Sequence, residues 1–443
     1  MGFDLQQYTD KIADVDCLDY EGAITRVTGA IIEARGPSVG VGQLVEIHTG
    51  CGNGSRTIKA EVIGFRDKNV TILMPLEKLN GVQPGDRAVS SYQDLEVGLG
   101  ENLLGRVLNG LGEPMDDGGQ ISCPHSAPLD KPAPHPLSRK EINEVFSTGI
   151  RAIDVGLTLG KGQRVGVFSG SGVGKSTLLG EIARYSEADA NVIALIGERG
   201  REVGEFIKEK LGPQGLRKSV VVVATADAPP LLKIKAAYTS TTIAEYLRDL
   251  GMDVLYMMDS LTRVANAQRE VGLAAGEPPT TRGYPPSTFS LVPELTERLG
   301  ISRRGSITGI YAVLVERDDF TEPVADTVRA TLDGHIALAR NLADRGHYPA
   351  IEMLGSVSRV MRALVCEEHL EVVRRLKGIL STYQEAEDLI KIGAYQQGSS
   401  PQIDRAIELM PEVNSVLCQR IGQHEPLESA LQKMKAITDR WEF

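Results

Sequence analysis

The chain has 443 residues and an acidic balance, with 59 Asp and Glu against 48 Lys and Arg, which gives a formal net charge of −11. This length predicts two or three domains, and the absence of basic patches argues against nucleic acid as a partner. The five cysteines lie far apart without a C-x-x-C pair, which indicates a reduced compartment. No run approaches the roughly 18 apolar residues that a membrane span requires. We therefore expect a cytoplasmic protein that docks on a membrane only peripherally.

Residues 1–18 are predicted to form a short N-terminal helical segment. Leu5, Tyr8, Ile12 and Val15 follow helical spacing and give this segment one apolar side. Two interpretations stay open, a helix that packs on its own domain and an arm that binds a partner.

Residues 19–95 read as a β-barrel domain. Short runs rich in Val, Ile and Thr, such as AITRVTGAII and NVTILM, alternate with turns that contain Gly and Asn. Residues 96–148 follow as a connector, with five prolines between Pro124 and Pro136. Proline at this density predicts a stiff link to the next domain.

Residues 149–359 alternate between apolar strand-like runs and helical patterns, which predicts an α/β nucleotide-binding domain of the RecA-like type with a mainly parallel sheet. Residues 360–443 are dominated by helical periodicity, as in VMRALVCEEHLEVVRRLKGIL, and predict a helical C-terminal domain.

The segment RVGVFSGSGVGKSTLLG, residues 164–180, has the layout of a strand, a glycine-rich turn and a helix that bind phosphate. Lys175 would approach the β- and γ-phosphates, and Ser176 would offer its hydroxyl to Mg²⁺. The strict motif has glycine at position 169, where this sequence has Ser169. A loop that bound phosphate without hydrolysis would have the same pattern. The ATP-binding residues predicted here are Ser169, Gly170, Ser171, Gly172, Val173, Gly174, Lys175, Ser176 and Thr177.

Two acidic residues end apolar strand-like runs and are candidates for the hydrolytic chemistry. Asp259 follows VLYMM and is predicted to help hold Mg²⁺, the alternative being a helix N-cap. Glu198 follows VIALIG and is assigned to polarise the attacking water, the alternative being a salt-bridged helix start.

The motifs SGSGVGKST, GERGREVGEF, MDSLTR, AAGEPPTTRGYPPSTF and YPAIEMLGSVSR together resemble the catalytic subunits of rotary ATP synthases and their relatives that energise type III protein export. The likeness covers nearly the whole chain. It implies ATP and Mg²⁺ as ligands and assigns catalysis to Lys175 and Glu198, with Arg199 and Glu202 in support.

The same resemblance implies that Tyr348 packs on the adenine ring and that Arg359 reaches into the site of a neighbouring copy. Taken alone, Tyr348 would be a core tyrosine and Arg359 a surface arginine. Glu352 stands where the family usually has aspartate, which puts the local geometry near Tyr348 in question.

Glu198, where non-catalytic relatives have glutamine, implies an ATP-hydrolysing enzyme. The loop text resembles flagellar export ATPases, so we expect a homohexamer that energises flagellar type III export at the inner membrane. Alternatives are an injectisome ATPase, a rotary ATP synthase subunit and an RNA-translocating helicase.

The expected partners are a coiled-coil stalk protein near Tyr395, Gln396 and Gln397, a dimeric regulator at the N-terminal segment, the export gate, and export substrates with their chaperones.

Overall fold

The computed structural model describes residues 20–50, 56–67, 69–90, 94–315 and 322–443. The helix expected within residues 1–18 lies outside the described residues. The chain divides into two compact units. One holds residues up to 96 together with 228–234 and 267–286, and the other holds residues 97–227, 235–266 and 287–443.

The first unit contains a closed barrel of antiparallel strands in the order β1-β2-β5-β4-β3-β6, in which β6 pairs again with β1. Along β3, Val45 and Ile47 alternate with more exposed residues and point into the barrel interior. The predicted β-barrel is therefore confirmed. The strands are β1 (Tyr20–Thr28), β2 (Ile31–Arg35), β3 (Leu44–Thr49), β4 (Arg56–Asp67), β5 (Val70–Pro75) and β6 (Arg87–Ser90).

The second unit is built on a sheet in the order β19-β18-β12-β17-β15-β13-β14-β8. All pairs from β18 to β8 are parallel, whereas β19 pairs antiparallel with β18 and β16 pairs antiparallel with β17. This confirms the mainly parallel sheet. The strands are β8 (Val107–Asn109), β12 (Arg164–Ser169), β13 (Ala190–Ile196), β14 (Ser219–Ala224), β15 (Asp253–Asp259), β16 (Gly300–Ile301), β17 (Ser306–Leu314), β18 (Gly334–Leu338) and β19 (Val357–Ser358).

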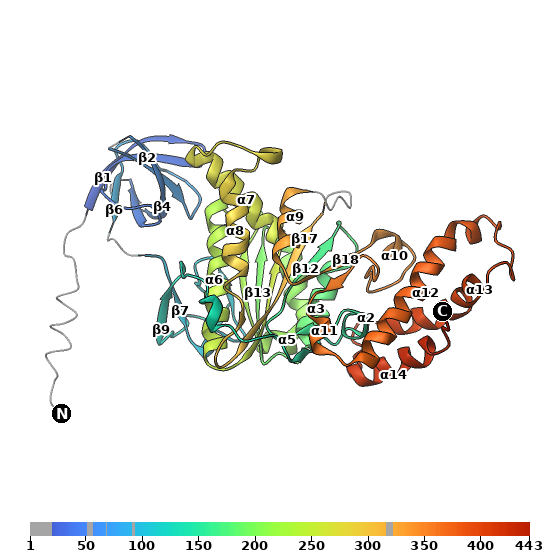
Figure 1. Cartoon of the computed structure of the whole chain (residues 1–443). Coiled ribbons are helices and arrows are strands. Elements are labelled where there is room, and N and C mark those ends of the chain that lie inside the picture. Colours follow the sequence, from blue (N-terminus) through green and yellow to red (C-terminus); the bar gives the residue numbers. More distant parts are fainter. Residues whose placement is uncertain (1–19, 51–55, 68, 91–93, 316–321) are drawn as a thin grey trace, which may run out of the picture. The chain divides into compact units, whose positions relative to one another are not determined.

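Helices cover both faces of this sheet (Figure 1). The chain moves one way along the strand order from β12 to β13 and β14, and back again to β15, β17 and β18. Because crossovers between parallel strands are right-handed, the connections made in the two directions lie on opposite faces. The first group is α3 (Lys175–Tyr185), α4 (Gly200–Glu205), the π-helix η3 (Phe206–Leu211) and α5 (Gly212–Arg217). The second includes α6 (Pro230–Asp249), α7 (Leu261–Ala275), α8 (Pro286–Thr296) and α9 (Pro323–Thr331). The short helix η4 (Thr281–Gly283) lies between α7 and α8 in the chain and belongs to the first unit.

The segment read from the sequence as a connector is part of the second unit's fold. Its strand β8 forms the edge of the central sheet beside β14, and β7 (Glu96–Leu99) pairs with β9 (His125–Pro128). The proline-rich stretch is also anchored, because the buried guanidinium of Arg298 donates a 2.8 Å hydrogen bond to the carbonyl of Leu129. The short pieces around it are η1 (Glu101–Leu103), η2 (Pro136–Ser138), β10 (Val145–Phe146), α2 (Arg151–Gly156) and β11 (Leu159–Gly160).

The C-terminal region is helical, as predicted, and shares one apolar core with the central sheet. Leu376 of α12, Val413 of α13 and Met434 of α14 belong to the same buried cluster as Val167 of β12 and Leu179 of α3. The helices are α10 (Arg340–Asp344), α11 (Met361–Leu364), α12 (Glu367–Lys391), α13 (Pro401–Leu417) and α14 (Leu427–Thr438).

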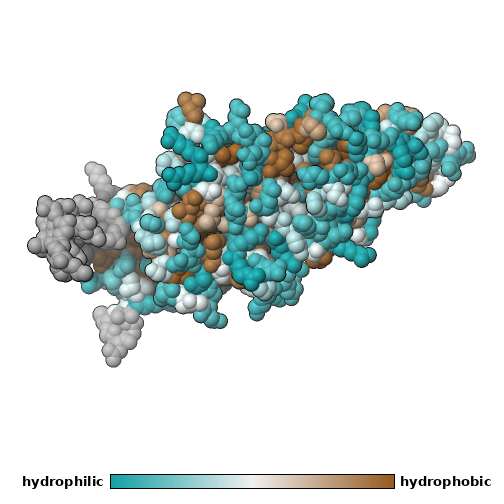
Figure 2. Space-filling view, turned by 90° about the horizontal axis from the view of Figure 1, so that it is seen from below, coloured by the Kyte–Doolittle hydropathy of each residue, from teal (hydrophilic) through white to brown (hydrophobic). Residues whose placement is uncertain are grey.

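Figure 2 shows a face on which hydrophilic residues predominate and apolar residues form patches between them. No helix among the described residues is long and apolar enough to cross a membrane.

The structure predicts that the buried pair of Arg298 and Glu245 supports the second unit. The Arg298 side chain is 0% exposed and lies 2.7 Å from the Glu245 carboxylate, which is 7% exposed. Arg298→Met would leave that carboxylate buried without its cation, so we expect a loss of about 3–5 kcal/mol in the free energy of unfolding. Urea unfolding followed by circular dichroism measures this loss.

A double variant, Arg298→Met with Glu245→Leu, is the control, because it removes the stranded charge and should recover most of the loss. An Arg298→Met variant as stable as the wild type would contradict the structural role of the pair.

Candidate functional site

The phosphate-binding loop lies between β12 and α3, as the sequence predicts. Gly172 and Gly174 have φ of 79° and 93°, in the left-handed region that favours glycine. Gly174 is the N-cap residue of α3 and has no side chain that could bond the N–H groups of the first helical turn. Free N–H groups at a helix N-terminus form an anion site, with Ser176 and Thr177 in the same turn.

Ser169, which replaces the glycine of the strict motif, is the last residue of β12. Its side chain is buried, and its hydroxyl oxygen has no hydrogen-bond partner in the described chain. Among the described residues, no hydrogen bond explains serine rather than glycine at this position.

Three of the predicted catalytic side chains meet at the carboxyl end of the sheet. Asp259 ends β15, and Glu198 follows β13, its direct neighbour in the sheet. Lys175 begins α3, and its ammonium group is ion-paired with Asp259 and lies 3.8 Å from a carboxylate oxygen of Glu198. All three are largely shielded from solvent, at 10% exposure for Lys175, 19% for Glu198 and 4% for Asp259.

The environment of Glu198 raises the pKa of its carboxyl to about 7. Burial is the main cause and the charge of Asp259 the second, while Lys175 acts in the opposite direction. A hydrogen bond between the carboxyl groups of Glu198 and Glu202 raises the pKa of Glu198 further and lowers the pKa of Glu202. The pattern is that of a protonated Glu198 that donates to an ionised Glu202.

Arg199 lies farther out than its neighbours in the motif. Its side chain is 79% exposed, and its guanidinium is 3.4 Å from Glu202. It therefore reaches Glu198 only through Glu202.

The donor set near the phosphate loop suits Mg²⁺ that arrives with a nucleotide. Among the described residues no group of three or more His, Cys, Asp or Glu could hold a metal ion. Mg²⁺ in nucleotide sites takes one or two protein oxygens together with phosphate oxygens and water. The hydroxyl of Ser176 and the carboxylate of Asp259 satisfy that requirement.

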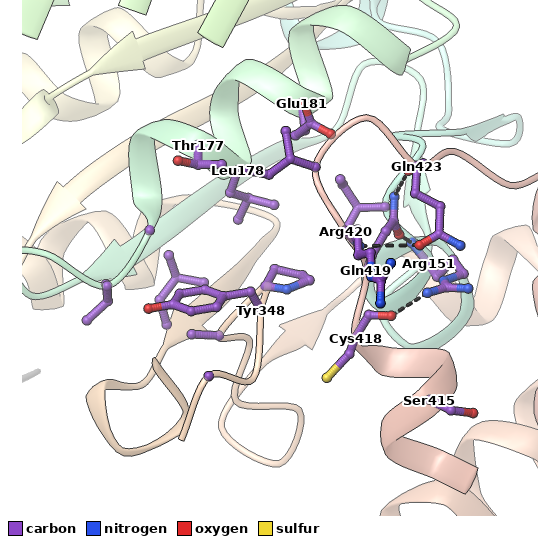
Figure 3. A pocket seen from close by; sticks show the side chains of 18 of the residues that line it. Arg151, Thr177, Leu178, Glu181, Tyr348, Ser415, Cys418, Gln419, Arg420 and Gln423 are labelled. Carbon is purple, nitrogen blue, oxygen red and sulfur yellow. Dashed lines mark hydrogen bonds between the residues drawn. The ribbon is translucent and has the colours of Figure 1, made fainter. Parts of the chain in front are cut away.

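A cavity of about 820 Å³ adjoins the phosphate loop (Figure 3). Figure 3 shows Tyr348 on one side, the α13–α14 loop on the other, and Thr177 and Glu181 of α3 along a third side. Tyr348 is 45% exposed, and its ring lies so close to Gly174 that a Cβ added there would meet it at 3.4 Å. A half-exposed ring in this place fits a stacking role rather than a core position.

The cavity also contains residues that the sequence reasoning missed, among them Arg151, Cys418, Gln419 and Arg420. They come from α2 and from the loop after α13. These segments are more than 260 positions apart in the chain, yet Arg151 and Gln419 are hydrogen-bonded. Neither segment has a motif, so no local signal marked them.

Arg359 does not line this cavity. It follows β19 on the surface, and its guanidinium donates a 3.0 Å hydrogen bond to the carbonyl of Arg329. Glu352 accepts a 3.2 Å hydrogen bond from the N–H of Leu354 in the turn that follows Tyr348.

The loop expected to contact a stalk follows α12. The Tyr395 hydroxyl donates to the carboxylate of Asp404, in the first turn of α13, at 2.9 Å. The surface here instead exposes Gln396 and Gln397, together with the apolar Ile392, which is 75% exposed.

Three family models match successive parts of the chain. The beta-barrel domain of the ATP synthase alpha/beta family matches residues 24–91, the nucleotide-binding domain of that family matches residues 149–358, and the T3SS EscN ATPase C-terminal domain matches residues 365–436.

Similar proteins extend over the full length. A flagellum-specific ATP synthase of Bacillus subtilis is 48% identical over 98% of this chain and 98% of its own. A type 3 secretion system ATPase of Xanthomonas euvesicatoria is 46% identical over 94% of each chain.

Among solved structures, the assembled ATPase EscN of enteropathogenic E. coli in complex with its central stalk EscO superimposes with a TM-score of 0.85 at 44% identity, over 94% of this chain and 100% of that one. With the phosphate loop, the acidic pair and the three-part fold in place, this chain belongs to the ATP synthase alpha/beta family, among the ATP-hydrolysing enzymes of flagellar and type III protein export.

Proposed function

We propose that this ATPase of flagellar type III export hydrolyses ATP with Mg²⁺ at sites shared between identical copies in a ring. The observation that carries the proposal is the convergence of Lys175, Glu198 and Asp259 beside the phosphate loop. This set provides a cation, a carboxylate near neutral pKa and a metal-binding carboxylate, which are the groups that hydrolysis of a γ-phosphate requires.

The residues of the loop have distinct roles in this mechanism. The free N–H groups at the start of α3 hold the phosphates, and Lys175 turns from Asp259 toward them. Ser176 and Asp259 would hold Mg²⁺, which offsets the negative charge that develops on the phosphoryl oxygens. Glu198 in its ionised form accepts a hydrogen bond from the attacking water. Burial and Asp259 are the main causes of the raised pKa of Glu198, Glu202 adds to it, and Arg199 pairs with Glu202.

Arg359 is proposed to complete the site of a neighbouring copy. Its exposure and its position outside the cavity of its own chain support this assignment, since a cation that acts within its own site would line that site. An isolated chain would then lack the charge that neutralises the transition state.

A ring of six copies is proposed to surround a stalk. The relative EscN has been solved as an assembled ATPase in complex with its central stalk EscO. On this chain the loop after α12 offers exposed Ile392, Gln396 and Gln397 for such a partner. The N-terminal segment 1–18 is the proposed site for a dimeric regulator. We further propose peripheral docking of the cytoplasmic ring at the export gate, where it acts on export substrates and their chaperones.

Mixing two inactive variants tests the shared site. Lys175→Ala destroys the phosphate loop of its own chain but keeps Arg359, and Arg359→Ala does the reverse. Each alone should lose a thousandfold or more in kcat, by order of magnitude. Co-assembled in equal amounts, they should regain activity at about one site in four, because a heterologous ring pairs each loop with its neighbour's arginine.

Magnesium-dependent phosphate release across a concentration series of the mixture measures this recovery. Arg362→Ala, at an exposed arginine of α11, is the matched control and should retain activity. A mixture as inactive as its parts would contradict action between copies, while inactivity of Lys175→Ala with full activity of Arg359→Ala would confine the site to one chain.

The pKa of Glu198 predicts a pH profile. Because only the ionised carboxylate accepts a hydrogen bond from water, kcat/KM should rise with pH through about 7, the pKa of Glu198 in the nucleotide-free enzyme. Glu202→Gln removes the neighbour that raises this pKa, so its profile should move to lower pH.

Initial rates at low ATP in a constant-ionic-strength buffer series provide the measurement. Glu198→Gln should be inactive at every pH. A rise that stays at the same pH in Glu202→Gln would assign the titration to a different group.

A further inference from the structure

The α13–α14 loop, residues 418–426, is tied to the nucleotide site mainly through Gln419. The side-chain oxygen of Gln419 accepts a 2.9 Å hydrogen bond from the N–H of Arg151. Its amide group donates to the carbonyl of Gly149 at 2.8 Å and to the carbonyl of Gln423 at 2.5 Å. One side chain thus satisfies backbone groups in two segments that are far apart in the sequence.

The main chain of Gln419 holds the wall of the cavity. Its N–H donates a 2.8 Å hydrogen bond to the carbonyl of Tyr348. The ring of Tyr348 contacts Gly174 of the phosphate loop, so the main-chain bond from Gln419 holds the residue whose side chain would stack on the base. Rotation of the Tyr348 backbone would therefore require this bond to break.

Three further contacts fix the same loop. The N–H of Gly422 donates a 2.7 Å hydrogen bond to the carboxylate of Glu181, a buried residue of α3. The guanidinium of Arg151 lies 3.2 Å from Glu425 and also donates to the carbonyl of Cys418. These bonds hold the loop at both ends. Gln419 connects it to Tyr348 and, through its side chain, to the segment before α2, and Cys418 adds a second hydrogen bond to the Tyr348 main chain.

We propose that Gln419 is a positioning residue that sets the affinity of the site for the base of the nucleotide. It acts by fixing Tyr348 and does not touch the phosphates. The inference rests on the proposed stacking role of Tyr348. Loss of the Gln419 side chain should therefore weaken the binding of ATP, whereas the binding of a phosphate chain without a base should stay the same.

The test compares ATP with inorganic tripolyphosphate. Gln419→Met keeps the length of the side chain without its polar groups, and Gln419→Glu keeps the acceptor for Arg151 while it loses both donated bonds. In each variant the KM for ATP should rise about five- to tenfold, the effect of one or two lost hydrogen bonds, with kcat nearly unchanged. The inhibition constant of tripolyphosphate should stay within about twofold of the wild type.

Gln432→Met is the matched control, since Gln432 is exposed on α14 and the same substitution there should change neither constant. Tyr348→Ala tests the proposed stacking separately and should raise the KM for ATP without a change for tripolyphosphate.

The possible outcomes distinguish the stacking role of Tyr348 from the positioning role of Gln419. A raised KM in Tyr348→Ala with a normal KM in both Gln419 variants would overturn the inference and leave the stacking role intact. A normal KM in Tyr348→Ala would overturn both. Equal weakening of ATP and tripolyphosphate in the Gln419 variants would reflect general damage to the site and would also overturn the inference.

Discussion

The candidate catalytic site at the carboxyl end of the central sheet depends on one cation, Lys175, that lies between two shielded carboxylates. Lys175 is ion-paired with Asp259 and lies 3.8 Å from Glu198, so a single positive charge faces two acidic groups where solvent is scarce. Burial first, and the charge of Asp259 second, raise the pKa of Glu198 to about 7. Phosphate oxygens offer Lys175 new partners. Nucleotide binding would therefore be linked to the charge of Glu198, the residue proposed to orient water.

The sheet makes this arrangement possible. Because β12, β15 and β13 are parallel, their carboxyl ends lie at the same edge, and the residues that follow each strand meet there. Strand ends are visible in a sequence as apolar runs that stop at a charged or glycine residue. For that reason Lys175, Glu198 and Asp259 could be placed together before any coordinates were available.

Other residues of the site are not preceded by a strand-like run or a motif that could be recognised in the sequence. Gln419 and Arg151 meet because the C-terminal helices pack on the central sheet through a common core, and this packing depends on many apolar residues that look alike in sequence. Strand β8 was missed for a similar reason. It has only three residues, and its pairing with β14 across the intervening chain has no periodic pattern. The prolines nearby constrain the backbone, but they do not exclude a fixed position, as the bond from Arg298 to the carbonyl of Leu129 shows.

The edge strand β8 also determines where this protein can be divided. Strand β14 pairs on one side with β13 and on the other with β8, so a fragment that begins at the start of the nucleotide-binding match would leave one side of β14 open. An open, apolar strand edge recruits strands from other molecules. The smallest soluble piece with the phosphate loop should therefore begin before residue 107, well upstream of the boundary that the motifs suggest.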